Sequence, residues 1–536
     1  MLRCHALHRL WQAASLPAWR RFRMALRQPA AAQQRVLHGI LQRNVSSDFG
    51  RRHRFGQLTS VDEFRRRVPL RTFEDFAADV ERVARGEPGV LTAEPVRRLV
   101  PTRGSSGGVK LIPFTDALGR EFRAAIGPWV AQLFFDHPAA RGGPAYWSIS
   151  PAQATLPPLA RNAAVPVGFD SDSAYLGRWA APPADATLAV RPDVRDLSDV
   201  DAFVRATAAE LLRCADLRLV SVWRPTYFTL LTDHARDHWD DVLRAIHEGT
   251  ATPRRSPNPR RARVLARLGP SSAASWWPRL AVVSARNDAA AATPARQLQQ
   301  SLPHAALQPK GLLATEGVVT IPFAGTRPAA VTSHFLEFIR DDGVVCGVGE
   351  LERGATYEVA MTTGGGLYRY RLGDRVEVEN FADATPCLKF LGRAGGVDLC
   401  GEKLTEAFVA SMLQSVFADA GLTPSFAMLA PQRLGRSWRY VLFLEGVTNA
   451  LDLTAPLDAA LSANLYYHQA RRCGQLDRVG VRVVDGVNAP QRYLQHLAAS
   501  DVPLGQIKLT VLSPRTDWGT VLASAAGERE PGIGFT

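Results

Sequence analysis

The chain has 536 residues, a formal net charge of +13, 46% hydrophobic residues and six cysteines. This size and composition predict a globular protein of two to four domains. No apolar run reaches the roughly 18 uncharged residues of a membrane-spanning helix. The scattered cysteines form no C-x-x-C pair, which argues against a zinc site or a disulfide framework and favours a reducing, cytoplasmic setting. We expect a cytoplasmic monomer without membrane or nucleic-acid partners.

Arginine carries almost all of the positive charge. Only five of the 64 basic residues are lysines, so a compact ammonium is informative wherever this chain uses one. The densest basic cluster, RRSPNPRRARVLAR from Arg254, contains prolines and no interleaved aromatic residues. It predicts a solvated surface connection in preference to a nucleic-acid site.

The arginine-rich N-terminal segment has two interpretations. It contains no acidic residue before Asp48, as in a transit peptide, but Val36, Ile40 and Leu41 share one face, as in an amphipathic helix. We favour the helix. Further helical patterns follow over residues 60–85, with a break at the proline in their middle.

Buried strands and helices should alternate in the next part of the chain. A short strand at Leu99–Val100 leads into a loop, and a helix should begin at Asp116. LRLVSVW from Leu217 and LAVVSA from Leu280 have the apolar, β-branched composition of buried strands, with helix between them. These patterns predict an α/β arrangement.

Strand-like runs dominate after Gly311. VVTIPF from Val318, HFLEFIR from His334 and TYEVAMTT from Thr356 predict an antiparallel sheet or barrel, with a hairpin turn at Asp342–Gly343.

The composition changes again after Arg393. An apolar helix face ends near Gly421, WRYVLFLEG is a strand, and TAPLDAALSANLYYHQA is a further helix. We expect a large N-terminal domain over residues 1–395, with α/β parts and a β-barrel, and a smaller C-terminal α/β domain over residues 396–536.

The stretch TRGSSGGVKLIPF from Thr102 predicts a phosphate-binding loop. Glycines let backbone N–H groups turn toward one point, hydroxyl groups add donors, and Lys110 adds charge. The spacing matches neither a Walker A loop nor G-x-G-x-x-G. The alternative is a flexible surface turn.

Five segments together resemble one family. The loop is similar to the phosphate loop of adenylate-forming enzymes, as are GLLATEG from Gly311, LYRYRLGD from Leu367, FLGR from Phe390 and QIK from Gln506. With DEFRRRVPLRTFEDF, QPKGLLATEG, HFLEFI and LSANLYYHQARRCGQL, they resemble the acyl-acid amido synthetases known as auxin-responsive (Gretchen Hagen) proteins, which include bacterial members. The resemblance covers about residues 30–512.

The resemblance implies a ligase that uses ATP and Mg²⁺. Such enzymes activate a carboxylic acid as an acyl adenylate and transfer it to an amino acid, releasing AMP and pyrophosphate. Because the first step brings anions together, the site must supply positive charge and aligned donors.

The resemblance also implies roles for individual residues. The phosphates would be held by Ser105, Ser106, Gly107 and Gly108, with Lys110 nearby. Thr315 would contact the α-phosphate, Glu316 would bind Mg²⁺, Asp374 would accept hydrogen bonds from ribose, and Arg393 would contact ribose or phosphate.

The C-terminal domain should supply a catalytic lysine. Lys508 has the matching place near the C-terminus, and Lys403 in GEKLTE is the runner-up. The acid itself would lie between the helix after the loop and Trp223, with Arg123 or Arg120 as candidates for its carboxylate. The alternative for each of these residues is a purely structural role, as a surface charge or in core packing.

Two other functions remain open at this point. An adenylate-forming thioester ligase would share the first half-reaction and use coenzyme A or a carrier protein as acceptor. A basic nucleic-acid-binding protein would rest on the cluster at Arg254 alone. Neither the acid nor the amine can be identified from the sequence.

Overall fold

The computed structural model describes most of the chain and divides it into two compact units. The first unit comprises Met1–Thr102 and Val109–Gly392, and the second comprises Arg103–Gly108 and Arg393–Thr536. The residues described are 2–103, 109–148, 160, 162–169, 185–197, 199–250, 255–288, 291–393, 396–435, 437–447, 453–484, 488–498 and 511–523.

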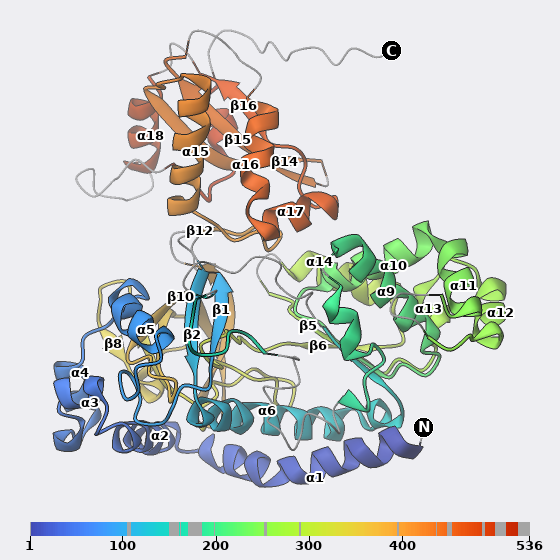
Figure 1. The fold of residues 1–536 in the computed structure, drawn as a ribbon. Helices are drawn as coiled ribbons and strands as arrows, with labels where there is room; N and C mark the ends of the chain where they lie inside the picture. The colour runs from blue at the N-terminus through green and yellow to red at the C-terminus, as the bar shows by residue number, and fades with distance from the viewer. Residues whose placement is uncertain are drawn as a thin grey trace. The chain divides into compact units, whose positions relative to one another are not determined.

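Long helices form the base of the first unit. Helices α1 (Leu2–Ala25) and α2 (Pro29–Arg43) lie next to α6 (Asp116–Asp136), as Figure 1 shows. The indole N–H of Trp19 in α1 donates to Oε1 of Gln132 in α6 over 2.8 Å. The expectation of an amphipathic N-terminal helix is confirmed, because α2 buries Leu37, Ile40 and Leu41. No described helix is long and apolar enough to cross a membrane.

Short elements lead from α2 to the predicted phosphate loop. They are α4 (Val61–Arg67), α5 (Ala77–Ala84) and the paired strands β1 (Arg98–Arg103) and β2 (Val109–Phe114). The loop at 104–108 lies outside the described residues. Helix α6 starts at Asp116, as expected, because the Thr115 hydroxyl accepts from the Leu118 N–H over 3.1 Å and caps the helix.

A four-stranded parallel sheet forms a second layer of the first unit. Its order is β3 (Ala145–Trp147), β4 (Leu219–Ser221), β5 (Val282–Ala285) and β6 (Ala306–Pro309). It packs with helices α9 (Val200–Arg213), α10 (Pro225–Asp237), α11 (Trp239–Glu248), α12 (Pro259–Leu268), α13 (Ala273–Trp276) and α14 (Ala292–Ser301). The buried strands expected at LRLVSVW and LAVVSA are confirmed as β4 and β5.

The basic cluster at Arg254 is not simply a solvated face. Arg255 pairs with Asp193 at 2.7 Å and with Glu210 at 2.9 Å. Arg261 is buried in α12 and donates to the backbone oxygens of Leu212 and Trp276. The expectation of a fully solvated cluster was wrong for these two arginines, because neighbouring acceptors bind them inside the fold, and this removes charge from a nucleic-acid surface.

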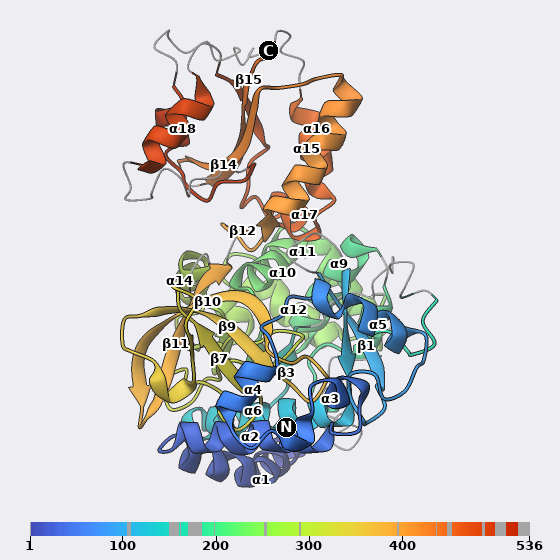
Figure 2. The same cartoon turned by 90° about the vertical axis from the view of Figure 1, so that its left-hand side faces the viewer.

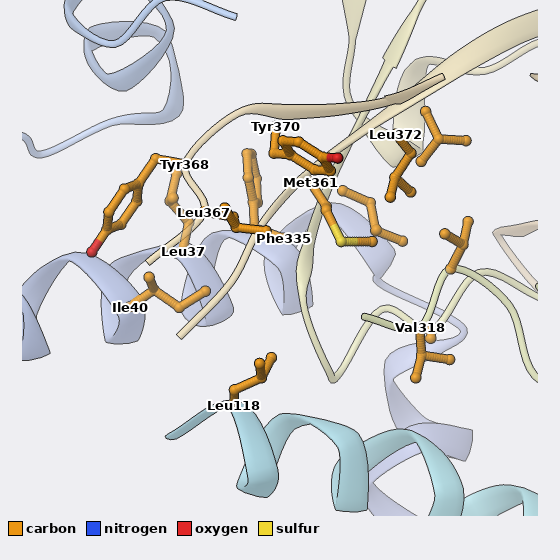
Figure 3. Close-up of a cluster of buried hydrophobic side chains, with 14 of the residues drawn as sticks. Leu37, Ile40, Leu118, Val318, Phe335, Met361, Leu367, Tyr368, Tyr370 and Leu372 are labelled. Atoms are coloured by element: carbon orange, nitrogen blue, oxygen red, sulfur yellow. The ribbon is translucent and has the colours of Figure 1, made fainter. Parts of the chain in front are cut away.

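An antiparallel sheet completes the first unit (Figure 2). Its strand order is β11 (Thr385–Arg393), β10 (Tyr370–Ala382), β9 (Thr356–Thr362), β7 (Phe335–Ile339) and β8 (Val345–Cys346). The hairpin at Asp342–Gly343 is confirmed, since β7 and β8 pair antiparallel and Gly343 takes a φ of 84°. Figure 3 shows Phe335, Met361 and Leu372 packing with Leu118 and Ile40 beneath this sheet.

The strand expected over VVTIPF does not form. Val318–Phe323 instead makes isolated bridges, Leu313 to Val318, Thr320 to Ala329 and Phe323 to Thr326. The run is apolar because it is buried, and Pro322 has no N–H with which to extend a ladder.

The second unit has its own sheet and core. Strands β14 (Phe426–Leu434), β15 (Ser437–Glu445) and β16 (Gly480–Val483) form one sheet, and β12 (Gly396–Val397) pairs with β13 (Leu404–Thr405). The helices are α15 (Glu406–Ala420), α16 (Thr454–Ser462), α17 (Leu465–Arg472), α18 (Ala489–Ala498) and α19 (Trp518–Val521).

Two helix expectations in this unit had different outcomes. The helix ending at Gly421 is confirmed as α15, and Gly421 takes a left-handed φ of 64°. The single helix expected over TAPLDAALSANLYYHQA is wrong, because Asn464 separates α16 from α17. The Asn464 side chain accepts from the N–H groups of Tyr466 and Tyr467 and so caps a new helix.

Candidate active site

The T-E-G sequence lies at the tip of a tight hairpin that follows β6. The backbone groups of Ala314 and Gly317 exchange hydrogen bonds of 2.9 and 3.2 Å, which leaves Thr315 and Glu316 as the two residues at the turn. Below the tip, Leu313 bridges Val318. The hairpin therefore fixes the backbone at the predicted phosphate and magnesium residues.

Glu316 is held against strand β10. Its residue is only 5% exposed, and the Tyr370 hydroxyl donates to its Oε1 over 3.3 Å. A buried carboxylate loses its hydration, so it is stable only where donors or cations replace water. The fold therefore holds the Glu316 carboxylate in a fixed position, which suits a role in binding a cation.

Lys110 also lies near Tyr370. Its Nζ lies 6.0 Å from the centre of the Tyr370 ring and 5.3 Å from that of Phe73, within the range of cation–π attraction. Lys110 also contributes to the lowered pKa of Glu74, where hydrogen bonds outweigh the opposing effect of burial. Two residues that the sequence predicted at one site, Lys110 and Glu316, are therefore brought to the same tyrosine.

Asp374 lies on the buried face of β10, at an irregularity in the strand. Arg371 pairs with Ala360 and Arg375 pairs with Glu358, so β10 has two more residues than β9 between these pairs. Gly373 has a φ of 74°, which suits a glycine at this bulge. The two extra residues preserve the alternation of faces, and Asp374, at 4% exposure, is buried on the same side as Tyr370. Bulges commonly re-aim a side chain beside an active site.

Several predicted site residues are placed elsewhere or lie outside the described residues. Ser105, Ser106, Gly107, Gly108 and Lys508 lie outside them, as does the side chain of Arg393. 

The predicted acid-binding residues lie on two elements. Arg123 is exposed on α6, and Arg120 on the same helix pairs with Glu94 at 2.6 Å. Trp223 follows β4 and is 41% exposed. In the second unit, Lys403 takes a left-handed φ of 48°, and its Nζ lies 5.5 Å from the Tyr466 ring.

The sequence did not predict the buried polar contacts next to this site. His334, in HFLEFI, is fully buried and its Nδ1 lies 3.0 Å from Oε2 of Glu121 in α6. Glu121 also accepts from the Gly364 N–H over 2.8 Å. The motif was visible in the sequence, but its partner is 213 residues away, and nothing local to Glu121 signals the pairing.

The His334 ring limits what the T-E-G turn can contain. A Cβ atom on Gly317 would lie 2.9 Å from His334 Nε2 and 3.0 Å from Met361 Sδ. Because Glu121 holds the imidazole, the ring cannot readily move away.

Gly317→Ala should displace the turn that carries Glu316. We expect it to cost about 1–3 kcal/mol of stability, as overpacking typically does, and to lower activity in ATP-dependent assays. Thermal unfolding and initial rates are the measurements. Gly349→Ala is the matched control, because its Cβ would make only an ordinary 3.5 Å contact with Ala30. Equal behaviour of the two variants would contradict the close packing at Gly317.

Comparison with known proteins identifies the family. The model of the GH3 family N-terminal domain matches residues 18–306, and that of the GH3 family central domain matches residues 328–393. The chain belongs to the GH3 family. The second match ends at the boundary between the two compact units and includes β10, which carries Tyr370 and Asp374.

Relatives of this GH3 protein match it over two thirds or more of its length. A probable indole-3-acetic acid-amido synthetase GH3.12 from Oryza sativa subsp. japonica is 25% identical over 580 aligned positions, covering 92% of each chain. Indole-3-acetic acid-amido synthetase GH3.4 from Arabidopsis thaliana is 23% identical and covers 68% of this chain and 67% of its own length. The solved AtGH3.15 acyl acid amido synthetase, in complex with 2,4-DB, is 19% identical, with a TM-score of 0.63 over 95% of each chain. This last likeness shows that the two proteins share a fold.

Proposed function

We propose that this GH3 protein is an ATP-dependent acyl-acid amido synthetase. It joins a small carboxylic acid to the amine of an amino acid, and ATP is converted to AMP and pyrophosphate. The observation that supports the proposal best is that Lys110 and Glu316 both lie near Tyr370 of β10, the strand that also carries Asp374, in a chain that belongs to a family whose relatives are named amido synthetases.

The chemistry requires activation of the acid before the amine attacks. A carboxylate has no good leaving group, whereas an acyl adenylate releases AMP. The carboxylate oxygen attacks the α-phosphorus of ATP, the bond to pyrophosphate breaks, and the acyl–phosphate anhydride forms. The amine then attacks the acyl carbon, the bond to AMP breaks, and a proton leaves the nitrogen.

The residues of this chain divide the task of binding ATP. Lys110 supplies positive charge where phosphate charge accumulates, together with the loop donors Ser105, Ser106, Gly107 and Gly108. Asp374 offers two carboxylate oxygens as acceptors for the ribose hydroxyls. Thr315 donates to the α-phosphate, and Arg393 contacts ribose or phosphate. Lys508, with Lys403 as the alternative, supplies the ammonium of the C-terminal unit.

The donor set at Glu316 fits Mg²⁺ bound together with a nucleotide. Among the described residues, no group of three or more His, Cys, Asp or Glu side chains could hold a metal by itself. Mg²⁺ is commonly bound through one or two carboxylates plus substrate phosphates, and Glu316 supplies one such carboxylate. When bound, the ion neutralises phosphate charge, and Glu316 fixes its place.

Pyrophosphate exchange tests the proposal. The full-length protein should exchange labelled pyrophosphate into ATP when an acid such as benzoate or indole-3-acetate is present, and should form amide only after an amino acid is added. Absence of exchange over a broad panel of acids would refute adenylate formation. Thioester formation with coenzyme A, without amide, would reassign the acceptor.

A further inference from the structure

Lys310 is a buried lysine without a role in the mechanism above. The residue is 3% exposed and follows β6 directly, ahead of the T-E-G hairpin. Its backbone N–H donates to the Ala285 oxygen over 2.9 Å, which ties it to the end of β5. Because the backbone is fixed in this way, the place of the ammonium is set by the sheet and not by a free loop.

Aromatic rings surround the ammonium. Its Nζ lies 4.0 Å from the centre of the Trp223 ring and 5.5 Å from that of Trp129. The Trp129 indole is itself fixed, since its N–H donates to Oε1 of Gln308 over 3.0 Å. Two aromatic rings beside one charged group resemble the lining of a site for a small ligand.

The charge of Lys310 lacks a compensating anion among the described residues. Burial and the nearby cation of Arg286 lower its pKa from 10.5 to about 7, and no carboxylate is among the groups that perturb it. Placing an ammonium here costs folding free energy, because desolvation disfavours the charged form. A residue whose pKa is so perturbed, in a chain that otherwise prefers arginine, is a candidate for ligand binding.

The position in the sheet indicates where a ligand would enter. Arg286 and Lys310 come directly after β5 and β6, and Trp223 is the second residue after β4; the three strands run parallel. They therefore share the carboxyl edge of the sheet, the edge at which ligands bind in open α/β sheets. Trp223 is 41% exposed there, so one wall of the site reaches solvent.

We propose that Lys310 binds a carboxylate of the acyl acid substrate, with the body of the acid against Trp223 and Trp129. The ligand supplies an anion for the buried ammonium, whose charge no described carboxylate compensates. This inference rests on the proposed function and deepens it. The carboxylate is either the one that reacts with ATP or a second acidic group of the same acid, and the test separates the two sources.

The test first selects a probe. Acid-dependent pyrophosphate exchange by the wild-type protein is measured with benzoate, indole-3-acetate and isophthalate, and the fastest acid is used with its primary amide as a neutral isostere. If no acid supports exchange, the proposed function fails and this inference fails with it. If exchange occurs but Lys310→Met exchanges with the same KM for the acid, only the inference fails.

Direct binding then distinguishes ligand recognition from a structural role. We expect Lys310→Met to bind the acid about 10- to 100-fold more weakly by equilibrium dialysis, because a charge-assisted hydrogen bond is lost, while amide binding is unchanged. Equal weakening of acid and amide would overturn the proposal. A loss with isophthalate but not with benzoate would assign Lys310 to a second carboxylate, and a loss with both would assign it to the reacting one.

Lysine NMR gives a readout without turnover. The chain has five lysines, so labelling with ε-¹³C-lysine gives five signals, and Lys310→Met removes the one shifted by the Trp223 ring. The acid should move that signal, and an unmoved signal at saturating acid would overturn the proposal. Lys389→Met is the matched control, since Lys389 makes an exposed 3.6 Å ion pair with Glu377.

Discussion

Glu316→Gln should lower acid-dependent pyrophosphate exchange by about 100-fold or more while the protein stays folded. The substitution keeps the size of the side chain and removes its charge. Stabilisation of developing phosphate charge through a bound Mg²⁺ contributes several kcal/mol, and each 1.36 kcal/mol corresponds to tenfold in rate. The variant should also need more Mg²⁺ for half-maximal exchange, which separates a metal role from general damage.

The surroundings of Glu316 favour retention of the fold in this variant. The Tyr370 hydroxyl can still donate to the amide oxygen of the new glutamine, and the hairpin is held by its own backbone hydrogen bonds. Glu377→Gln on β10 is the control, because it loses only the exposed pair with Lys389, and such pairs contribute about 0–1 kcal/mol. Exchange at the wild-type rate by Glu316→Gln, with unchanged Mg²⁺ dependence, would remove Glu316 from the metal site.

The sequence could predict those features of this site that depend on local motifs, but not those that depend on strand pairing. Glu316 and Asp374 were predicted because T-E-G and Leu367–Asp374 resemble short family motifs. The bulge before Asp374 was not identifiable, because it depends on the pairing with β9 and not on β10 alone. A Gly-Asp pair is also common at hairpin turns, so the pair by itself does not indicate a bulge within one strand.

The same limit applies to the fold. The parallel strands β4 and β5 were visible as apolar runs, and the Thr115 cap and Gly421 end marked two helices. The run at Val318 had the same composition as a strand, but it is buried and makes only isolated bridges. An apolar composition predicts burial, but a strand also needs a second strand to pair with. Which segments pair depends on the tertiary structure.

Buried partners far apart in the chain were the largest omission. HFLEFI and YRYRLGD were recognised as separate motifs, yet Glu337 in the first and Arg369 in the second form an ion pair of 2.9 Å. Arg65 from α4 completes the group at 3.1 Å from the same carboxylate. Charged residues in strands usually face solvent, so nothing in the sequence marked Glu337 as fully buried.

This group fixes the start of β10. Arg369 has a left-handed φ of 51° and donates through Nη1 to the backbone oxygens of Arg65 and Val68. The next residue is Tyr370, whose hydroxyl contacts Glu316. The Glu337 carboxylate therefore stabilises a strained backbone position directly beside the site.

Glu337→Ala should lower the stability of the first unit by about 3–5 kcal/mol, because it leaves a buried guanidinium without its counter-charge. The measurement is the thermal unfolding midpoint, which should fall. ATP affinity should fall as well, because Tyr370 would be displaced. Glu358→Ala is the matched control on β9, where Arg371, the partner at 2.6 Å, is 44% exposed, and it should cost about 1 kcal/mol or less.

A second substitution tests the cause of that loss. Arg369→Met in the Glu337→Ala background should recover part of the stability, because an unpaired buried cation is then replaced by an apolar side chain of similar length. If the double variant is less stable than Glu337→Ala by the full cost of Arg369→Met alone, the two side chains act independently. The hydrogen bonds of Arg369 to the α4 segment, and not its pairing with Glu337, would then hold Tyr370 against Glu316.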